Sequence, residues 1–135
     1  MKIFEECYTL SNGAKIPKMG LGTWFIPDET VSQAVKDAVK IGYRHFDTAQ
    51  AYGNERGVGE GIRTCGVPRE ELFVVSKVAA EHKTYEAAKA GIDETLKKMG
   101  LDYLDMMIIH SPQPWVEVNQ SENRYKEGNR QAWKA

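Results

Sequence analysis

Three apolar runs in this chain each end at an ionisable residue. The runs reach Asp47, Lys77 and His110, which are 30 and 33 positions apart (47 to 77, then 77 to 110). That spacing is typical of one strand-helix-strand step. In a barrel of parallel strands the carboxyl ends all lie on one face, where catalytic groups are found. We therefore predict that these side chains, although distant in sequence, meet at one end of a parallel sheet.

The composition indicates an ordinary globular domain. The 135 residues are 41% hydrophobic and 27% charged with a net charge of −1, which argues against a nucleic-acid-binding surface. Acidic residues interrupt the first few positions before a signal-peptide core could form, and no apolar run approaches the roughly 18 residues of a membrane span. Cys7 and Cys65 are isolated, which argues against a disulfide framework. We expect a cytoplasmic protein with no membrane, nucleic-acid or metal partner.

Turn and capping residues divide the chain into alternating strands and helices. Asn12-Gly13 predicts positive φ angles in the turn of a hairpin over about 8–17. Asp28 and Thr84 are candidate helix caps, and Gly42 is a candidate helix end. We expect strands at about 19–22, 43–47, 72–76 and 104–109, and helices at about 28–42, 55–65, 84–100 and from 129 onward.

The alternation of apolar strands with helices predicts an α/β protein with a parallel sheet covered on both faces. The expected fold is a parallel (β/α)8 TIM-barrel type, here only about the first four β-α units. A complete barrel takes about 250 residues. Residues 1–135 would therefore form an N-terminal half, with a hairpin at 8–17, β-α units over 19–135 and an end within the fourth helix. The glycine-rich stretch 57–61 lies inside a helix, so close packing on the sheet is favoured over dinucleotide binding.

The ionisable residues at the strand ends suggest a separate chemical role for each side chain. Tyr52 stands five positions after Asp47 on the same predicted loop. The Asp47 carboxylate would hold a buried Lys77 charged. The lysine would in turn help the Tyr52 phenol to give up its proton, and His110 could orient a carbonyl oxygen. This arrangement suits carbonyl reduction, with the hydride supplied by a cofactor.

Several segments around these residues resemble the aldo-keto reductases. Residues 42–49 (Gly-Tyr-Arg-His-Phe-Asp-Thr-Ala) and 52–55 (Tyr-Gly-Asn-Glu) are similar to the N-terminal signature of that family. Segments 75–77 and 108–110 are similar to its later catalytic strands, and segment 20–24 is similar to its first-strand loop. The resemblance extends from about residue 9 to the end of the chain.

The resemblance implies a function and a set of site residues. The family reduces aldehydes and ketones to alcohols with NADPH, or in some members with NADH. Tyr52 would be the proton donor within a catalytic tetrad of Asp47, Tyr52, Lys77 and His110. The residues expected to contact the cofactor are Gly22, Thr23 and Asp47. Those expected to line the substrate pocket are Trp24 and Trp115.

Two departures from the family pattern bear on function. Many members have Trp after the catalytic His, whereas Ser111 stands here. The family also binds the adenosine and phosphates of the cofactor through loops in the second half of the barrel, which residues 1–135 do not include. We therefore expect little NADPH binding by this chain alone. Because the edges of an open sheet invite pairing, we expect self-association or a complementary half-barrel as partner.

Other functions stay open at this stage. The main alternative is a half-barrel assembly protein without turnover. A barrel aldolase would use Lys77 as a Schiff-base nucleophile, although the family segments argue against it. A metal-dependent hydrolase that uses His45, Asp47 and His110 is a further alternative, which the sequence favours less than the other two.

Overall fold

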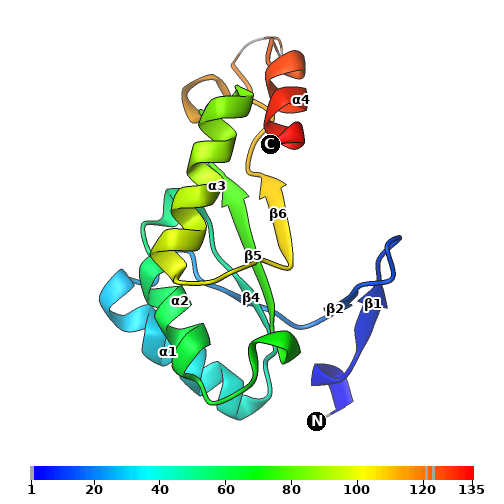
Figure 1. Cartoon of the computed structure of the whole chain (residues 1–135), viewed down its shortest axis with the longest axis vertical. Coiled ribbons are helices and arrows are strands. Elements are labelled where there is room, and N and C mark those ends of the chain that lie inside the picture. The colour runs from blue at the N-terminus through cyan, green and yellow to red at the C-terminus, as the bar shows by residue number, and fades with distance from the viewer. Residues whose placement is uncertain (1, 121, 123) are drawn as a thin grey trace.

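The computed structural model describes residues 2–120, 122 and 124–135, and strands and helices alternate along it (Figure 1). An antiparallel hairpin comes first, made of β1 (Cys7–Thr9) and β2 (Lys15–Pro17). The further strands are β3 (Leu21–Gly22), β4 (His45–Asp47), β5 (Phe73–Val78) and β6 (Met106–Ile109). The α-helices are α1 (Asp28–Ile41), α2 (Glu55–Thr64), α3 (Tyr85–Met99) and α4 (Lys126–Lys134). Short 3₁₀ turns are η1 (Lys2–Phe4), η2 (Gln50–Tyr52), η3 (Arg69–Glu71) and η4 (Trp115–Glu117).

The described strands β3, β4, β5 and β6 form a parallel sheet in that order. Gly22 lies opposite Asp47 in the register, and Lys77 lies opposite Ile108. Because the strands run the same way, their carboxyl ends share one edge of the sheet. The predicted fold class, a partial (β/α) barrel after a hairpin, is confirmed. β5 extends to Val78, so Lys77 lies within this strand rather than after it.

The main apolar core lies between the helices α1, α2 and α3 and the strands β4 and β5. Its side chains come from positions that share one face of each helix or strand, as amphipathic periodicity requires. In Figure 1, α1 and α2 lie together and α3 runs along β5. The side chains with no exposed surface in this core are Val31, Val35, Phe46, Val58, Val74 and Met99.

Helix α2 packs on the sheet as predicted, through Val58 and Ile62, but its glycines lie against other helices. A Cβ at Gly57 would meet the backbone of Asp28 in α1, and a Cβ at Gly61 would meet Val35 of the same helix. A Cβ at Gly59 would meet the backbone of Met99 at the end of α3. The glycines therefore let α2 lie close to both neighbouring helices.

Two of the expected turn and cap residues act differently from their local pattern. Asp28 is the first residue of α1 rather than its cap, which is Pro27. The Asp28 carboxylate instead accepts hydrogen bonds from the Gly57 backbone N–H (2.7 Å) and from Arg56 (2.6 Å), which joins α1 to α2. Asn12 lacks the expected positive φ, and its side chain accepts from a backbone N–H nearby.

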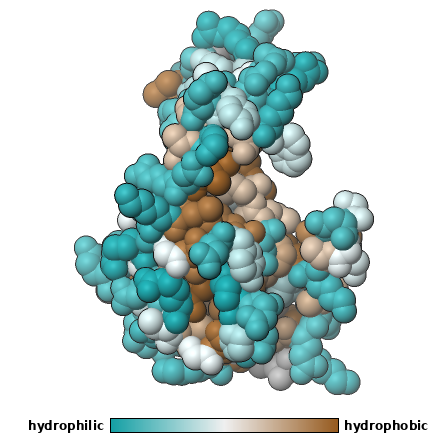
Figure 2. Space-filling model, viewed as in Figure 1, coloured by the Kyte–Doolittle hydropathy of each residue, from teal (hydrophilic) through white to brown (hydrophobic). Residues whose placement is uncertain are grey.

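Strand β6 and helix α4 form a less covered side of the molecule, here called the open flank. All six residues of β5 are buried, whereas none of the four residues of β6 is. Ile108 of β6 is 38% exposed and Trp133 of α4 is 76% exposed. Figure 2 shows hydrophobic residues gathered in the middle of the face on which Figure 1 places α3 and β6. Within the described residues, no helix combines the length and apolarity needed to span a bilayer.

Candidate active site

Lys77 lies at the centre of a polar cluster at the carboxyl end of the sheet. Its ammonium donates to both carboxylate oxygens of Asp47 (2.6 and 2.7 Å) and to the backbone carbonyl of Thr48 (2.8 Å). It also donates to the hydroxyl oxygen of Tyr52 (3.1 Å). Lys77 is only 8% exposed, so these partners offset the cost of removing its charge from water. The Lys77 nitrogen is therefore held between a carboxylate and a phenol.

Tyr52 reaches this cluster from the loop between β4 and α2. It ends the turn η2, where its backbone N–H donates to the carbonyl of Ala49 (3.0 Å). Gly53 follows with φ 69°, a left-handed conformation that glycine adopts without a steric cost. Because Lys77 donates to the Tyr52 hydroxyl oxygen, the hydroxyl hydrogen is available to a group on the other side.

His110 directly follows β6 and faces the Tyr52 ring. The two rings meet edge to face at 5.6 Å between centroids, and Trp115 meets His110 in the same way at 4.9 Å. Burial, together with the nearby Lys77 charge, holds the pKa of His110 below its usual value, although Asp47 and Glu81 oppose this shift. The imidazole is therefore neutral near pH 7, with one ring N–H to donate.

An open cavity of about 510 Å³ lies over Tyr52 and His110. Aromatic side chains dominate its lining, which consists of Trp24, Ala51, Tyr52, His110 and Trp115. A volume of this order suits a small organic ligand. The lining is mostly aromatic, and the Tyr52 hydroxyl and the His110 imidazole are among its polar groups. This chemistry suits an apolar ligand with one hydrogen-bonding oxygen.

The structure brings Asp47, Tyr52, Lys77 and His110 together, and it places Trp24 and Trp115 on the cavity above them. Their catalytic and binding roles stay predictions.

The residues predicted to contact a cofactor occupy different environments. Gly22 has open space where a Cβ would stand, next to Asp47 in the register. Thr23 has no exposed surface, and both its backbone N–H (3.1 Å) and its hydroxyl (2.9 Å) donate to the carbonyl of Asp47. The donors of Thr23 are thus committed to joining the ends of β3 and β4.

The structure adds Gln50, Asn54 and Glu55, to which sequence reasoning assigns no role. These polar residues flank Tyr52. Asn54 and Glu55 bond to the segments that carry Trp24 and Lys77, and Gln50 bonds to Thr95 of α3. Their signal in the sequence is that Asn54 and Glu55 belong to segment 52–55, which is similar to the family signature but does not indicate what they bond to.

His45 lies away from this cluster. Its Nδ1 is 3.1 Å from the carbonyl oxygen of Pro17, and its ring packs edge to face on Phe73 with centroids 5.2 Å apart. In the part of the chain that the structure describes, no group of three or more His, Cys, Asp or Glu side chains is placed to hold a metal ion. The metal-dependent hydrolase hypothesis therefore has no structural support.

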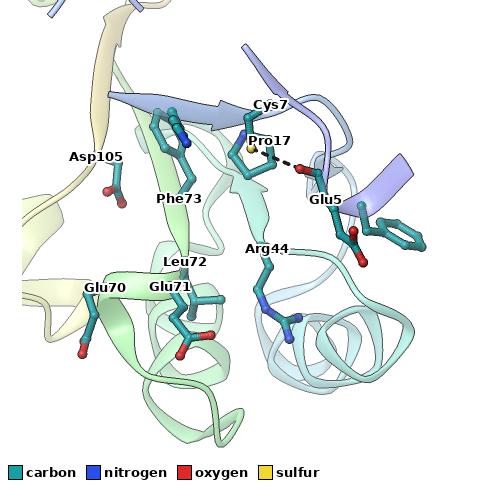
Figure 3. Close-up of a pocket in the computed structure, with 11 residues that line it drawn as sticks. Glu5, Cys7, Pro17, Arg44, Glu70, Glu71, Leu72, Phe73 and Asp105 are labelled. Atoms are coloured by element: carbon teal, nitrogen blue, oxygen red, sulfur yellow. Dashed lines mark hydrogen bonds between the residues drawn. The ribbon is translucent and has the colours of Figure 1, made fainter. Parts of the chain in front are cut away.

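A second cavity, of about 300 Å³, lies at the amino ends of the strands (Figure 3). Arg44 and Asp105, which precede β4 and β6, line it together with Phe73 at the start of β5 and Pro17 of the hairpin. Arg44 donates to the backbone carbonyls of Val39 and Tyr43, and Asp105 pairs with a neighbouring arginine. Arg44 and Asp105 thus stabilise the fold at this end, as is usual for charged residues at the amino end of a barrel.

Comparisons with known proteins agree with this geometry. The Aldo/keto reductase family model matches residues 18–132. The chain is 46% identical to 9,11-endoperoxide prostaglandin H2 reductase of Trypanosoma cruzi, over 79% of this chain and 38% of that protein. It is 47% identical to glycerol 2-dehydrogenase (NADP(+)) of Saccharomyces cerevisiae, over 77% of this chain and 33% of that protein.

A solved structure gives the same result for the fold. The aldo-keto reductase of Bombyx mori in complex with NADP superposes with a TM-score of 0.81 at 34% identity, over 96% of this chain and 45% of that chain. The present chain therefore spans less than half the length of these relatives. With a parallel sheet, a polar cluster at its carboxyl end and a family match over most of its length, the chain belongs to the aldo/keto reductase family.

Proposed function

We propose that this chain is the catalytic N-terminal half of an enzyme that reduces aldehydes or ketones to alcohols with NADPH, or with NADH. The observation that carries the proposal is the position of the Lys77 ammonium, between the Asp47 carboxylate and the Tyr52 hydroxyl. The names of two relatives, a reductase and an NADP(+)-linked dehydrogenase, support the same class of reaction.

Tyr52 is the proposed proton donor. The substrate's carbonyl oxygen would lie in the cavity. It would receive the phenolic proton as the carbonyl group is reduced to an alcohol. Tyr52 would then be left as a phenolate, 3.1 Å from the Lys77 ammonium, which stabilises the negative charge. Asp47 keeps the ammonium in place through both carboxylate oxygens. Water would return the proton to Tyr52 after the alcohol leaves.

His110 is proposed to orient the substrate. A neutral imidazole beside the Tyr52 ring can donate one N–H to the carbonyl oxygen while that oxygen takes the tyrosine proton. Trp24 and Trp115 would pack on the apolar part of the substrate. We propose no specific carbonyl compound.

The residues present fit one end of a nicotinamide cofactor. When bound, the reduced nicotinamide supplies the hydride. The open space beside Gly22 and the adjoining Asp47 and Tyr52 are proposed to hold the nicotinamide end, with Thr23 fixing the strand ends beneath it. Among the described residues that line the cavity, none carries a positive charge for the cofactor phosphates. We therefore propose that NADPH binds only when the remainder of a barrel is present.

The open flank is the proposed place where that remainder binds. β6 pairs on one side only in the described sheet. Its own residue Ile108 and Trp133 of α4 are exposed. An unpaired edge with apolar neighbours favours association with another chain. We propose either a complementary half-barrel or, in its absence, a second copy of this chain as the partner.

The surroundings of Lys77 disfavour the aldolase alternative. A Schiff-base lysine must be neutral to attack a carbonyl. Here the lysine nitrogen already donates hydrogen bonds to a carboxylate, a backbone carbonyl and a phenol oxygen. A carbonyl carbon would also have to displace these partners to reach the nitrogen.

The test uses a completed barrel, in which residues 1–135 are joined to the part of the Bombyx mori aldo-keto reductase that they do not cover. With NADPH and a simple aromatic aldehyde, we expect equal amounts of NADPH consumed and alcohol formed. Calorimetry should detect saturable NADPH binding to the completed barrel and none to the chain alone. A covalent adduct trapped on Lys77 by borohydride, without NADPH consumption, would overturn the proposal in favour of an aldolase.

A further inference from the structure

Two buried polar residues directly follow the loop that carries Tyr52. Asn54 is 1% exposed and Glu55 is 3% exposed. Both stand at the start of α2, where Asn is favoured as a cap and Glu interacts well with the helix dipole. The bonds of these two side chains go beyond capping the helix and interacting with its dipole. Asn54 occupies the cap position without a side-chain capping hydrogen bond, and both side chains bond to other segments of the fold.

Asn54 joins the loop of Tyr52 to the loop of Trp24. Its amide group donates to the backbone carbonyls of Thr23 (2.8 Å) and Ile26 (3.0 Å). Its carbonyl oxygen accepts from the hydroxyl of Thr48 (2.7 Å). Every polar atom of the amide therefore has a partner, and the two donors hold both ends of the segment 23–26.

That segment contains a backbone conformation that needs such support. Phe25 has φ 64°, which is unusual for a bulky residue. Such a conformation persists only where the surrounding contacts determine it. The bonds from Asn54 to Thr23 and Ile26 enclose Phe25, so they fix the loop that holds Trp24 over the cavity.

Glu55 joins the same loop to β5. One carboxylate oxygen, Oε1, accepts from the hydroxyls of Ser76 (2.6 Å) and Thr95 (3.0 Å). Ser76 immediately precedes Lys77 on β5. Gln50 completes the connection from the other side of Tyr52, because its amide donates to Thr95 (3.1 Å).

We propose that Asn54 and Glu55 are positioning residues that set where Tyr52 lies relative to Lys77 and Trp24. This inference rests on the proposed function, because the position matters most if Tyr52 transfers a proton. Hydrogen bonds fix direction as well as distance, which apolar contacts at these positions would not do. A displacement of about 1 Å in a reacting group can lower turnover by about 10²-fold. The pair therefore holds the proton donor, the ammonium and one cavity wall in a single arrangement.

The first experiment measures geometry in the 135-residue chain by NMR. Nuclear Overhauser effects from the ring of Tyr52 to the rings of Trp24 and His110 report how closely these side chains approach one another. We expect them to weaken in Glu55→Ala and Asn54→Ala. Glu55→Gln, which keeps an oxygen to accept from the two hydroxyls, should restore them. The matched control is Glu60→Ala, since Glu60 lies on the same helix and pairs with Arg56 instead of with β5.

The second experiment measures turnover in the completed barrel. We expect Glu55→Ala to lower kcat by about 10- to 100-fold with KM changed by less than about threefold, and Glu55→Gln to recover most of the loss. Unchanged Overhauser effects and kcat in both alanine variants would overturn the inference. So would a Gln variant as impaired as the Ala variant. If Glu55→Ala does not fold, Thr95→Val removes one donor to the carboxylate and provides the same comparison.

The two proposals can fail separately. If Tyr52→Phe in the completed barrel keeps full turnover, the proposed function is wrong. The Overhauser comparison would still decide whether Asn54 and Glu55 hold the ring of Tyr52 against His110, because it needs neither cofactor nor substrate.

Discussion

The two sides of this half-barrel differ in how completely they are covered. Around β4 and β5, side chains such as Phe46 and Val74 have no exposed surface, and α1, α2 and α3 pack over them. We call this side the closed flank. The β6 residues Met107 and Ile109 on the open flank pack against a smaller cluster. Its buried members among the described residues are Val78 of β5, Ala88 of α3 and Ala132 of α4.

The active-site cluster draws on both flanks. Asp47, Tyr52 and Lys77 belong to the closed flank, where the ammonium contacts are complete within the chain. His110 and Trp115 follow β6 on the open flank. The His110 ring meets Tyr52 on one side and Trp115 on the other. The comparison shows that the contacts of Tyr52, the proposed proton donor, are complete within the chain. His110, the proposed substrate-orienting residue, depends on a strand that pairs on one side only in the described sheet.

The largest expected contrast between the flanks is in core stability. Phe46→Ala should lower the free energy of unfolding by about 3–5 kcal/mol, because it opens a cavity in the closed flank. Ile108→Ala should cost less than about 1 kcal/mol, since this residue is already partly exposed and loses less burial. Urea unfolding followed by circular dichroism measures both. Equal losses would contradict the comparison.

A second contrast concerns close helix packing. Gly59→Ala should destabilise the chain by about 1–3 kcal/mol, because the new methyl group meets the backbone of Met99, which cannot move away easily. The matched control is Gly22→Ala, where a Cβ meets nothing within 4 Å. The same urea titration applies. A neutral Gly59→Ala variant would mean that α2 and α3 can separate without cost.

The open flank should control self-association. We expect light scattering to detect assemblies larger than a monomer. Ile108→Lys combined with Trp133→Lys should weaken association at least about tenfold, which corresponds to about 1.4 kcal/mol. Tyr8→Lys is the control, because Tyr8 is an exposed aromatic of the hairpin, outside the open flank. A well-folded monomer at high concentration in the unmodified chain would refute this prediction.

The smallest expected effect is the pH dependence due to His110. Its pKa in the folded chain lies below the unfolded value because of burial and Lys77, opposed by Asp47 and Glu81. The unfolded state therefore binds more protons as the pH falls through this window, and stability is lost on acidification. Between about pH 8 and pH 5, the unmodified chain should lose more stability than His110→Gln. Parallel losses in the two proteins would show that His110 does not contribute.

Much of the fold followed from local patterns in the sequence. The strand order and direction, the hairpin and the Thr84 cap on α3 were all predictable from apolar runs and turn residues. Local patterns gave wrong predictions where a residue contacts a partner that is distant in sequence. Asp28 bonds to α2 instead of capping its own helix. The glycines of α2 meet other helices, which the local pattern did not indicate.

The candidate site shows the same limit. The strand-end spacing predicted that Asp47, Lys77 and His110 would share one end of the sheet. It gave no sign of the roles of Asn54 and Glu55, because their partners stand far away in sequence. Glu55 bonds to Thr95, which is 40 positions further along the chain. Such contacts depend on how helices pack, and a single sequence does not show this.

The most direct test of the proposed function is the effect of Tyr52→Phe on turnover in the completed barrel. The substitution removes the phenolic proton and leaves the ring in contact with His110 and Trp24. Steady-state kinetics with NADPH and an aldehyde should show kcat lowered by about 10²- to 10⁴-fold with KM nearly unchanged. Turnover equal to that of the unmodified barrel, in a variant that still binds NADPH, would contradict the assignment of Tyr52 as the proton donor.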